Sequence, residues 1–119
     1  MHPIHFYRNP RGEEPVYDYM KELSMRTDKD SRIKLNKIQD YISALSSMGK
    51  AAGQPYLKHL EGEIWELRPL RDRIMFVAWH DDGFVLLHTF MKTTQKTPKR
   101  EIEKAERELE DLLERGDFL

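Results

Sequence analysis

The segment Arg73–His80, RIMFVAWH, restricts most strongly what this chain can fold into. Its residue types are typical of a β-strand, and apolar side chains occupy both its odd and its even positions. Successive side chains of a strand point to opposite faces of the sheet, so this strand must be buried on both faces. The chain therefore needs a sheet with a covering layer on each side.

Further strands are predicted on both sides of this segment, at Ile64–Leu70 and Phe84–Lys92. The connections Leu70–Asp72 and Asp81–Gly83 are tight turns, and turns this short join only antiparallel neighbours. A short strand is also predicted at His2–Arg8, because the chain breaks after it at an Asn-Pro-Arg-Gly turn. The segment 51–62 is expected to be a loop.

Helical spacing predicts two helices before these strands and one after them. The first begins at Pro15, and the second begins near Thr27 as its cap and ends at Gly49. The third begins with Thr97 as cap and Pro98 as first residue and ends at Gly116. The apolar stripes are Val16, Tyr19, Met20 and Leu23, then Leu35, Ile38, Ile42 and Leu45, and finally Ile102, Ala105, Leu109, Leu112 and Leu113.

These elements predict an α+β fold, with a small antiparallel or mixed sheet and two N-terminal helices packed on one face. The second face would be covered by the C-terminal helix, by a partner chain, or by both. At 119 residues the chain has the length of one domain, so we expect residues 1–119 to form a single domain.

The composition excludes several classes of protein. There is no cysteine, which rules out disulfide scaffolds and thiolate zinc sites. No window approaches the roughly 20 apolar residues of a membrane span. The beginning of the sequence, MHPIHFYRNPRGEEP, lacks the apolar core of a signal peptide. We therefore expect a cytoplasmic protein that does not bind a membrane.

The net charge of −1 hides an uneven distribution along the chain. Residues 101–119 hold eight acidic and three basic residues, whereas residues 1–100 hold 13 acidic and 17 basic ones. A mildly basic body is compatible with an anionic ligand, although a solvated surface of mixed charge is the commoner meaning of such numbers.

Cations in otherwise apolar strands are the strongest functional signal, because burying an unpaired charge is costly. Arg68 and Arg73 lie on opposite sides of one tight turn, and Lys92 ends the strand that should pair with the one beginning at Arg73. The three side chains are expected to meet at one end of the sheet. Two guanidinium groups and an ammonium group suit a phosphate, although each cation alone is better explained by a structural role, such as an ion pair of Arg68 with Glu66 or Asp72.

The histidines and Lys58 give weaker evidence of a functional role than these three cations do. His88 lies in an apolar strand, and both a hydrogen-bonded core role and a role in proton transfer stay open for it. Lys58 and His59 form a small polar cluster that would reach a phosphate or face solvent. His2 and His5 have no metal-ligand partners at suitable spacing, and no Gly-rich phosphate loop is present, so we expect neither metal nor cofactor.

The segment KHLEGEIWELRPLRDRIMFVAWHDDGFVLLHTFMKTTQKTPKREIEKA resembles HigB-like toxins of the RelE/ParE superfamily, in the phage-derived branch. The resemblance covers residues 58–105. It rests on three motifs in order: the IWELR strand, a following strand that begins with arginine, and the strand end FMKTTQKTP. The strand–helix–helix beginning also suits that family, which implies a RelE/ParE-like fold.

The resemblance implies the toxin of a type II toxin–antitoxin system. Such a toxin is a ribosome-dependent, metal-independent mRNA endonuclease that inhibits translation and growth. Its partners would be mRNA, the ribosome and a HigA-like helix-turn-helix antitoxin, and it would meet operator DNA only through that antitoxin.

The resemblance also suggests roles for individual residues. Arg73 would be the phosphate-contacting arginine after the hairpin turn, and Lys92 the first of two strand-end lysines. Thr93 stands where many relatives have the second lysine. The expected catalytic set is Arg68, Arg73, Lys92 and His88, and the expected RNA-binding set is Lys58, His59, Lys96, Lys99 and Arg100.

Two other functions are compatible with the same sequence. ParE-like proteins of the superfamily poison DNA gyrase, and a fold alone does not separate them from nucleases. Here the basic strand end and the hairpin arginines favour RNA cleavage. A non-catalytic protein-binding module is the second alternative, supported by the apolar strand RIMFVAWH.

Overall fold

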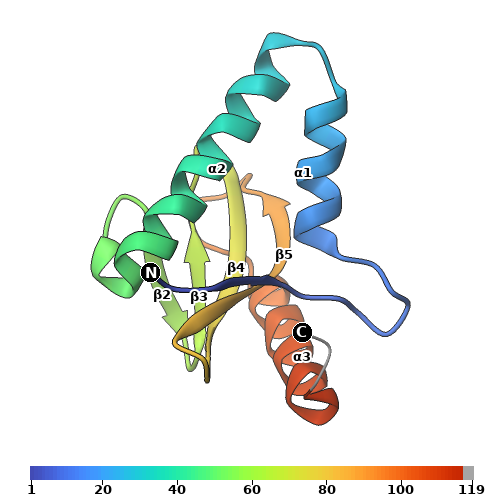
Figure 1. Ribbon diagram of the computed structural model, residues 1–119, viewed down its shortest axis with the longest axis vertical. Helices are drawn as coiled ribbons and strands as arrows, with labels where there is room; N and C mark the ends of the chain where they lie inside the picture. The colour runs from blue at the N-terminus through green and yellow to red at the C-terminus, as the bar shows by residue number, and fades with distance from the viewer. Residues whose placement is uncertain (117–119) are drawn as a thin grey trace.

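The computed structural model describes residues 1–116, which form a five-stranded mixed sheet and three α-helices (Figure 1). The elements in chain order are β1 (Ile4–Phe6), α1 (Pro15–Met25), α2 (Lys29–Met48), the 3₁₀ turn η1 (Gly49–Ala52), β2 (Leu57–Glu61), β3 (Ile64–Leu67), β4 (Asp72–Trp79), β5 (Gly83–Met91) and α3 (Lys99–Arg115). The α+β class predicted from the sequence is confirmed.

The sheet has the strand order β1-β5-β4-β3-β2. Strands β2 to β5 form a continuous antiparallel meander, and β1 joins the edge of β5 as its parallel neighbour. The pairing of β4 with β5 contains one irregularity, because Met75 pairs with His88 whereas the next residue, Phe76, pairs with Leu86. Leu87 is therefore an extra residue, as in a β-bulge.

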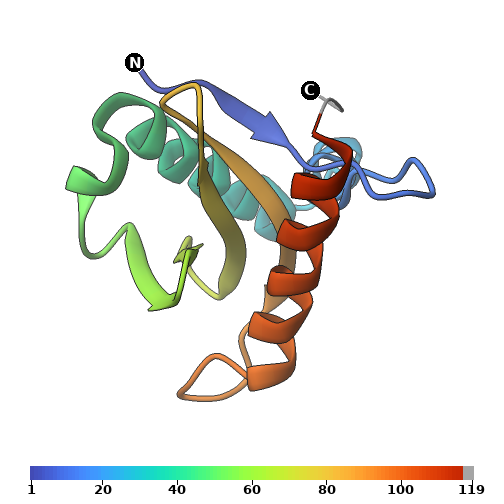
Figure 2. The same ribbon diagram turned by 90° about the horizontal axis from the view of Figure 1, so that it is seen from below.

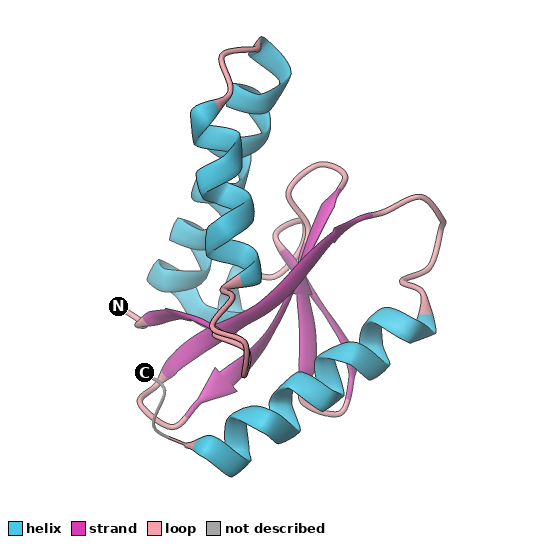
Figure 3. Cartoon of the chain, turned by 90° about the vertical axis from the view of Figure 1, so that its right-hand side faces the viewer, coloured by secondary structure: helices cyan, strands magenta, loops and turns pink. Residues whose placement is uncertain are grey.

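The two faces of the sheet are covered by different helices, as Figure 3 shows. On one face α1 and α2 bury Val16, Leu23, Ile38 and Leu45 against Phe76 and neighbouring strand residues. On the other face α3 buries Ala105 and Leu112 against Met75 and Val77. The prediction that β4 is covered on both sides is confirmed, and α3 supplies the second layer.

The predicted C-terminal ends of α2 and α3 at glycine residues are confirmed, whereas the predicted N-terminal cap residues of both helices are wrong. Gly49 and Gly116 follow α2 and α3 with positive φ angles of 60° and 69°. The cap of α2 is Asp28 rather than Thr27, because the Asp28 carboxylate accepts a hydrogen bond from the backbone N–H of Ser31. Thr97 does not cap α3: Pro98 occupies that position, and the Thr97 hydroxyl binds a side chain of β3 instead.

Two further predictions are wrong. The segment 51–62 is not wholly a loop, because Leu57–Glu61 forms the edge strand β2. Its lysine, histidine and glutamate are poor strand formers, and edge strands tolerate such residues because one side faces solvent. Leu113 is not part of the apolar stripe of α3, since it is 62% exposed.

Candidate functional site

The predicted site residues Arg68, Arg73 and Lys92 lie close together at the end of the sheet where β3 ends, β4 begins and β5 ends. The turn between β3 and β4 and the segment after β5 run side by side there, because the Lys92 N–H donates to the Arg71 carbonyl at 2.8 Å. Figure 2 shows that segment 92–98, in orange, leaves the sheet and turns back into α3. The site is thus built by one hairpin turn and one connecting segment.

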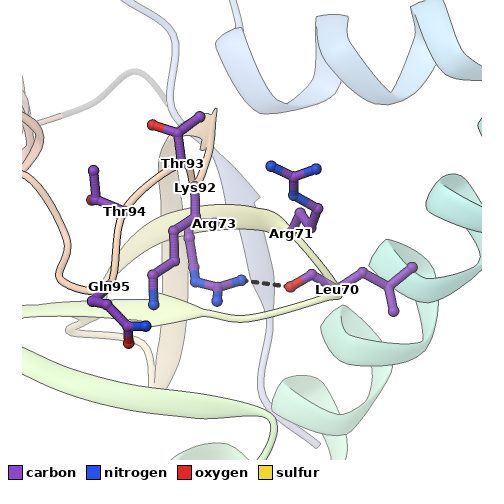
Figure 4. A pocket seen from close by; sticks show the side chains of 7 residues that line it. All are labelled: Leu70, Arg71, Arg73, Lys92, Thr93, Thr94 and Gln95. Atoms are coloured by element: carbon purple, nitrogen blue, oxygen red, sulfur yellow. Dashed lines mark hydrogen bonds between the residues drawn. The ribbon is translucent and has the colours of Figure 1, made fainter.

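Two adjoining hollows occupy this end of the sheet, and they share Lys92 and Gln95. We call them together the cationic groove. One hollow is lined by Leu70, Arg71, Arg73, Lys92, Thr93, Thr94 and Gln95 (Figure 4). The other is lined by Lys58, His59, Leu60, Glu66, Arg68, Lys92, Gln95, Lys96, Thr97 and Ile102. Cations from the two hairpin strands and from segment 92–98 therefore border one continuous surface.

Arg73 forms part of the floor of this groove and also stabilises its turn. Its Nη1 atom donates to the carbonyl oxygens of Leu70 and Asp72, both at 2.8 Å. Leu70 has a positive φ of 57°, a conformation that a leucine rarely adopts. Arg73 is 7% exposed, and burial lowers the pKa of its guanidinium, which nearby Glu66 partly offsets. The groove is therefore bordered by a strained turn held by a buried cation.

Lys92 stands in a field of like charge. Partial burial lowers the pKa of its ammonium, and the charges of Arg73, Arg68 and Lys58 lower it further. Figure 4 shows its side chain extending beside Arg73 toward the amide of Gln95. A cation that is destabilised by its neighbours in this way gains from binding an anion, because the anion screens that repulsion.

Glu66 is a groove residue that the sequence interpretation considered only as a possible ion-pair partner of Arg68. It is 1% exposed and lies on β3, with its Oε2 atom 3.5 Å from Nε of Arg68 and 3.9 Å from Nε of Arg73. Its Oε1 atom accepts a hydrogen bond of 2.7 Å from Thr97. The signal that selected the arginines, a charge in an apolar strand, was equally present for Glu66 in IWELR.

The family of the chain follows from comparison with known proteins. A family model described as "Phage derived protein Gp49-like (DUF891)" matches residues 18–110, which include the whole groove. The chain belongs to this Gp49-like family. The Gp49-like family is a RelE/HigB-like toxin family of toxin–antitoxin systems, associated with endoribonuclease toxins. No curated protein matches the chain.

The other cations predicted to bind RNA divide into two groups in this Gp49-like protein. Lys58 and Lys96 line the cationic groove. Lys99 and Arg100 are exposed in the first turn of α3 and do not line either hollow, and Arg100 lies 3.8 Å from Glu101. His59 borders the groove, but its Nε2 atom is 2.7 Å from the Gly62 carbonyl oxygen.

His88 lies away from the groove in the Gp49-like structure. It is 1% exposed, and its two ring nitrogens contact the carboxylates of Glu108 at 2.5 Å and Glu101 at 3.0 Å. The sequence interpretation gave it the same strand parity as Phe84, Leu86, Phe90 and Lys92. The bulge at Leu87 divides this set: Phe84 and Leu86 pack with α1 and α2, whereas His88 and Phe90 lie on the α3 face.

The charged side chains that line the groove of the Gp49-like chain are mainly those of lysine and arginine. In residues 1–116 no group of three or more His, Cys, Asp or Glu side chains is arranged to hold a metal ion. None of the helices in the same range is long and apolar enough to cross a membrane. What the groove provides is positive charge with donors fixed by the sheet, which suits a polyanion and a developing negative charge.

Proposed function

We propose that this Gp49-like protein is the toxin of a type II toxin–antitoxin system and cleaves mRNA on the ribosome. The observation that carries this proposal is the convergence of Arg68, Arg73 and Lys92 in one groove. The family membership supports a toxin, and the groove supports a nuclease rather than a ParE-like gyrase poison, because a phosphate is the ligand that these donors fit.

RNA carries its own nucleophile, the 2′-hydroxyl, so the protein does not need to provide one. Cleavage requires the 2′-oxygen to lie in line with the leaving oxygen and the developing charge on phosphorus to be neutralised. In this mechanism Arg68 and Arg73 bind the non-bridging oxygens of the scissile phosphate. Lys92, whose pKa is lowered by partial burial and by the neighbouring arginines, supplies a further positive charge beside the scissile phosphate.

Lys58 and Lys96, at the rim of the groove, would contact the flanking phosphates. Thr93, which replaces the second lysine found in many relatives, is exposed at the edge of the first hollow. Lys96 and Lys58 would supply the charge that Thr93 lacks. The mechanism uses no metal and no cofactor.

The remaining elements of the proposal follow from the same assignment. Residues 1–119 form one RelE/ParE-like domain that acts in the cytoplasm. Its partners are the ribosome with its mRNA and a HigA-like helix-turn-helix antitoxin, which neutralises the toxin and connects it to operator DNA.

The test is growth of a bacterial host after induced expression, combined with a transcriptome-wide map of new RNA 5′ ends. Wild-type protein should arrest growth and produce in-frame cuts. Lys92→Ala and Arg68→Ala should abolish both effects while remaining soluble. Lys37→Ala is the matched control. It removes an exposed cation of α2 that does not line either hollow of the groove, and it should behave like wild type.

Three outcomes would overturn the proposal. Healthy growth with soluble wild-type protein would exclude a toxin. Intact messages with DNA damage would indicate a gyrase poison. Undiminished cutting by both groove variants would place the active site elsewhere.

A further inference from the structure

The two oxygen atoms of the Glu66 carboxylate contact different parts of the groove. Oε1 accepts the hydroxyl hydrogen of Thr97 at 2.7 Å, which attaches segment 92–98 to β3. Oε2 faces the Nε atoms of Arg68 and Arg73, at 3.5 Å and 3.9 Å. One buried side chain thus connects the three parts of the chain that form the groove: the end of β3, the start of β4 and the segment after β5.

The contacts of Glu66 with the arginines are ion pairs without hydrogen bonds. Both distances exceed the usual range of an N–H···O bond, and within the described residues neither buried Nε atom has a hydrogen-bond partner. Nearly all buried donors in proteins are paired, so two unpaired donors side by side are unusual. The carboxylate attracts both guanidinium groups but does not form a hydrogen bond with either Nε–H group.

Glu66 is unsuited to direct contact with RNA. Its side chain is 2% exposed, and a carboxylate repels a phosphate. A buried charge in this place is unfavourable unless its neighbours compensate it, so its presence calls for a role. The role that fits the contacts is to hold the cations that surround it.

We propose that Glu66 is a positioning residue, which holds Arg68, Arg73 and segment 92–98 around an anion without forming a hydrogen bond to the Nε–H group of either arginine. The proposed function supplies the identity of that anion, an RNA phosphate. Glu66 balances part of the repulsion between the two guanidinium groups, which would otherwise separate before the phosphate arrives. Through Thr97 it also fixes the segment on which Lys92 and Lys96 lie.

If Glu66 has this role, its replacement by glutamine should not weaken RNA binding but should slow RNA cleavage. Glu66→Gln removes a negative charge from a cationic groove, so simple electrostatics predicts equal or tighter binding of RNA. A positioning role predicts slower cleavage, since displacement of catalytic groups by about 1 Å costs on the order of 100-fold in rate. A residue that merely stabilises the fold would leave the cleavage rate unchanged in a protein that is still folded.

The experiment uses the full chain in a reconstituted bacterial translation system with a reporter message, and a fluorescent single-stranded RNA oligonucleotide for binding. Glu66→Gln should bind the oligonucleotide at least as tightly as wild type and cleave the reporter about 100-fold more slowly. Glu63→Gln makes an equal change of charge at an exposed position in the β2–β3 turn, and it should alter neither RNA binding nor the rate of cleavage. Thr97→Val, which leaves Glu66 charged, should slow cleavage by a smaller factor. Wild-type turnover in Glu66→Gln would overturn the proposal.

A second measurement separates this inference from the proposed function. The Nε–Hε signals of Arg68 and Arg73 in NMR spectra report on the two guanidinium groups whether or not the protein cuts RNA. In the wild type they should exchange slowly and should shift on addition of inorganic phosphate, and in Glu66→Gln both should broaden.

If the wild type cuts no RNA but the signals behave in this way, the proposed function fails and the positioning role stands. Freely exchanging Arg68 and Arg73 signals in the wild type would overturn the positioning role, even if Glu66→Gln does not fold.

Discussion

Glu108 on α3 binds His88 on β5 inside the protein, with Oε1 of the carboxylate 2.5 Å from Nδ1 of the imidazole. Glu101, about two turns earlier on the same face of α3, contacts the other ring nitrogen. The histidine therefore connects α3 to the sheet through polar contacts that lie next to the apolar contacts of Ala105 and Leu112. From this arrangement we propose that His88 attaches α3 to the sheet and takes no part in catalysis.

We accordingly expect His88→Ala to destabilise the protein without removing its chemistry. Loss of the imidazole leaves the buried Glu108 carboxylate unpaired, which typically costs about 3 kcal/mol. Urea unfolding monitored by tryptophan fluorescence would measure this loss. The double variant His88→Ala/Glu108→Gln should recover part of it, because the unpaired charge is then removed. A stable His88→Ala protein that no longer cleaves RNA would return His88 to the active site.

Arg73 is expected to affect both stability and activity, in contrast to Arg68. Arg73 donates to two carbonyl groups of the β3–β4 turn, so Arg73→Ala should lower the free energy of unfolding by roughly 1–3 kcal/mol. Loss of a charge-stabilising donor should also reduce cleavage by on the order of 100- to 1000-fold. Parallel urea unfolding and cleavage assays would measure the two effects.

Arg68→Ala is the comparison for this prediction, because no side-chain hydrogen bond of Arg68 is found within the described residues. It should lose activity with a smaller loss of stability. Equal stability losses in the two variants would show that the turn contacts of Arg73 carry little energy.

The sequence predicted the layers of the fold because they depend on local pattern. An apolar strand with no polar face requires two covering layers, and the glycines and tight turns mark element ends irrespective of the rest of the chain. Strand β2 escaped prediction because only Leu57 and Leu60 of its five residues are apolar and its pairing with β3 is a tertiary property. The cap at Thr97 failed for a similar reason, since its hydroxyl binds Glu66, 31 positions away.

The sequence predicted the convergence of the arginines and Lys92 because tight turns leave little freedom at strand ends. It wrongly gave His88 the same face as Phe84 and Leu86, because one extra residue in a strand reverses the parity of everything beyond it, and Leu87 carries no residue-type signal for such a bulge. It also grouped Lys99 and Arg100 with the groove by proximity along the chain, whereas the first turn of α3 leaves both exposed outside its hollows.

The two groups of cations should differ in the salt dependence of RNA binding. Each phosphate contact to a single strand contributes a slope of about −0.7 in a plot of log affinity against log salt concentration. Lys58→Ala and Lys96→Ala should each reduce that slope by up to this amount, because both lysines line the groove. Lys99→Ala should leave it nearly unchanged. Fluorescence anisotropy with a single-stranded oligonucleotide at several salt concentrations would measure the slopes, and a full loss in Lys99→Ala would extend the RNA path onto α3.

Lys92 should give RNA binding a dependence on alkaline pH. Partial burial and the charges of Arg73 and Arg68 hold its pKa below the usual value of 10.5, so the free protein loses this proton at a lower pH than an ordinary lysine would. A bound phosphate favours the charged form, and binding therefore takes up a proton once the pH exceeds the lowered pKa. Affinity should be constant below that pKa and should fall as the pH rises through it.

Lys92→Arg is the matched variant, since arginine stays charged over the whole range. Its affinity for the same oligonucleotide should remain flat where that of the wild type falls. Because Lys92 takes up one proton, the RNA affinity of the wild type should fall by at most tenfold for each unit of pH. Identical pH profiles for the two proteins would show that Lys92 does not contact the phosphate, and the centre of the groove would then be the two arginines alone.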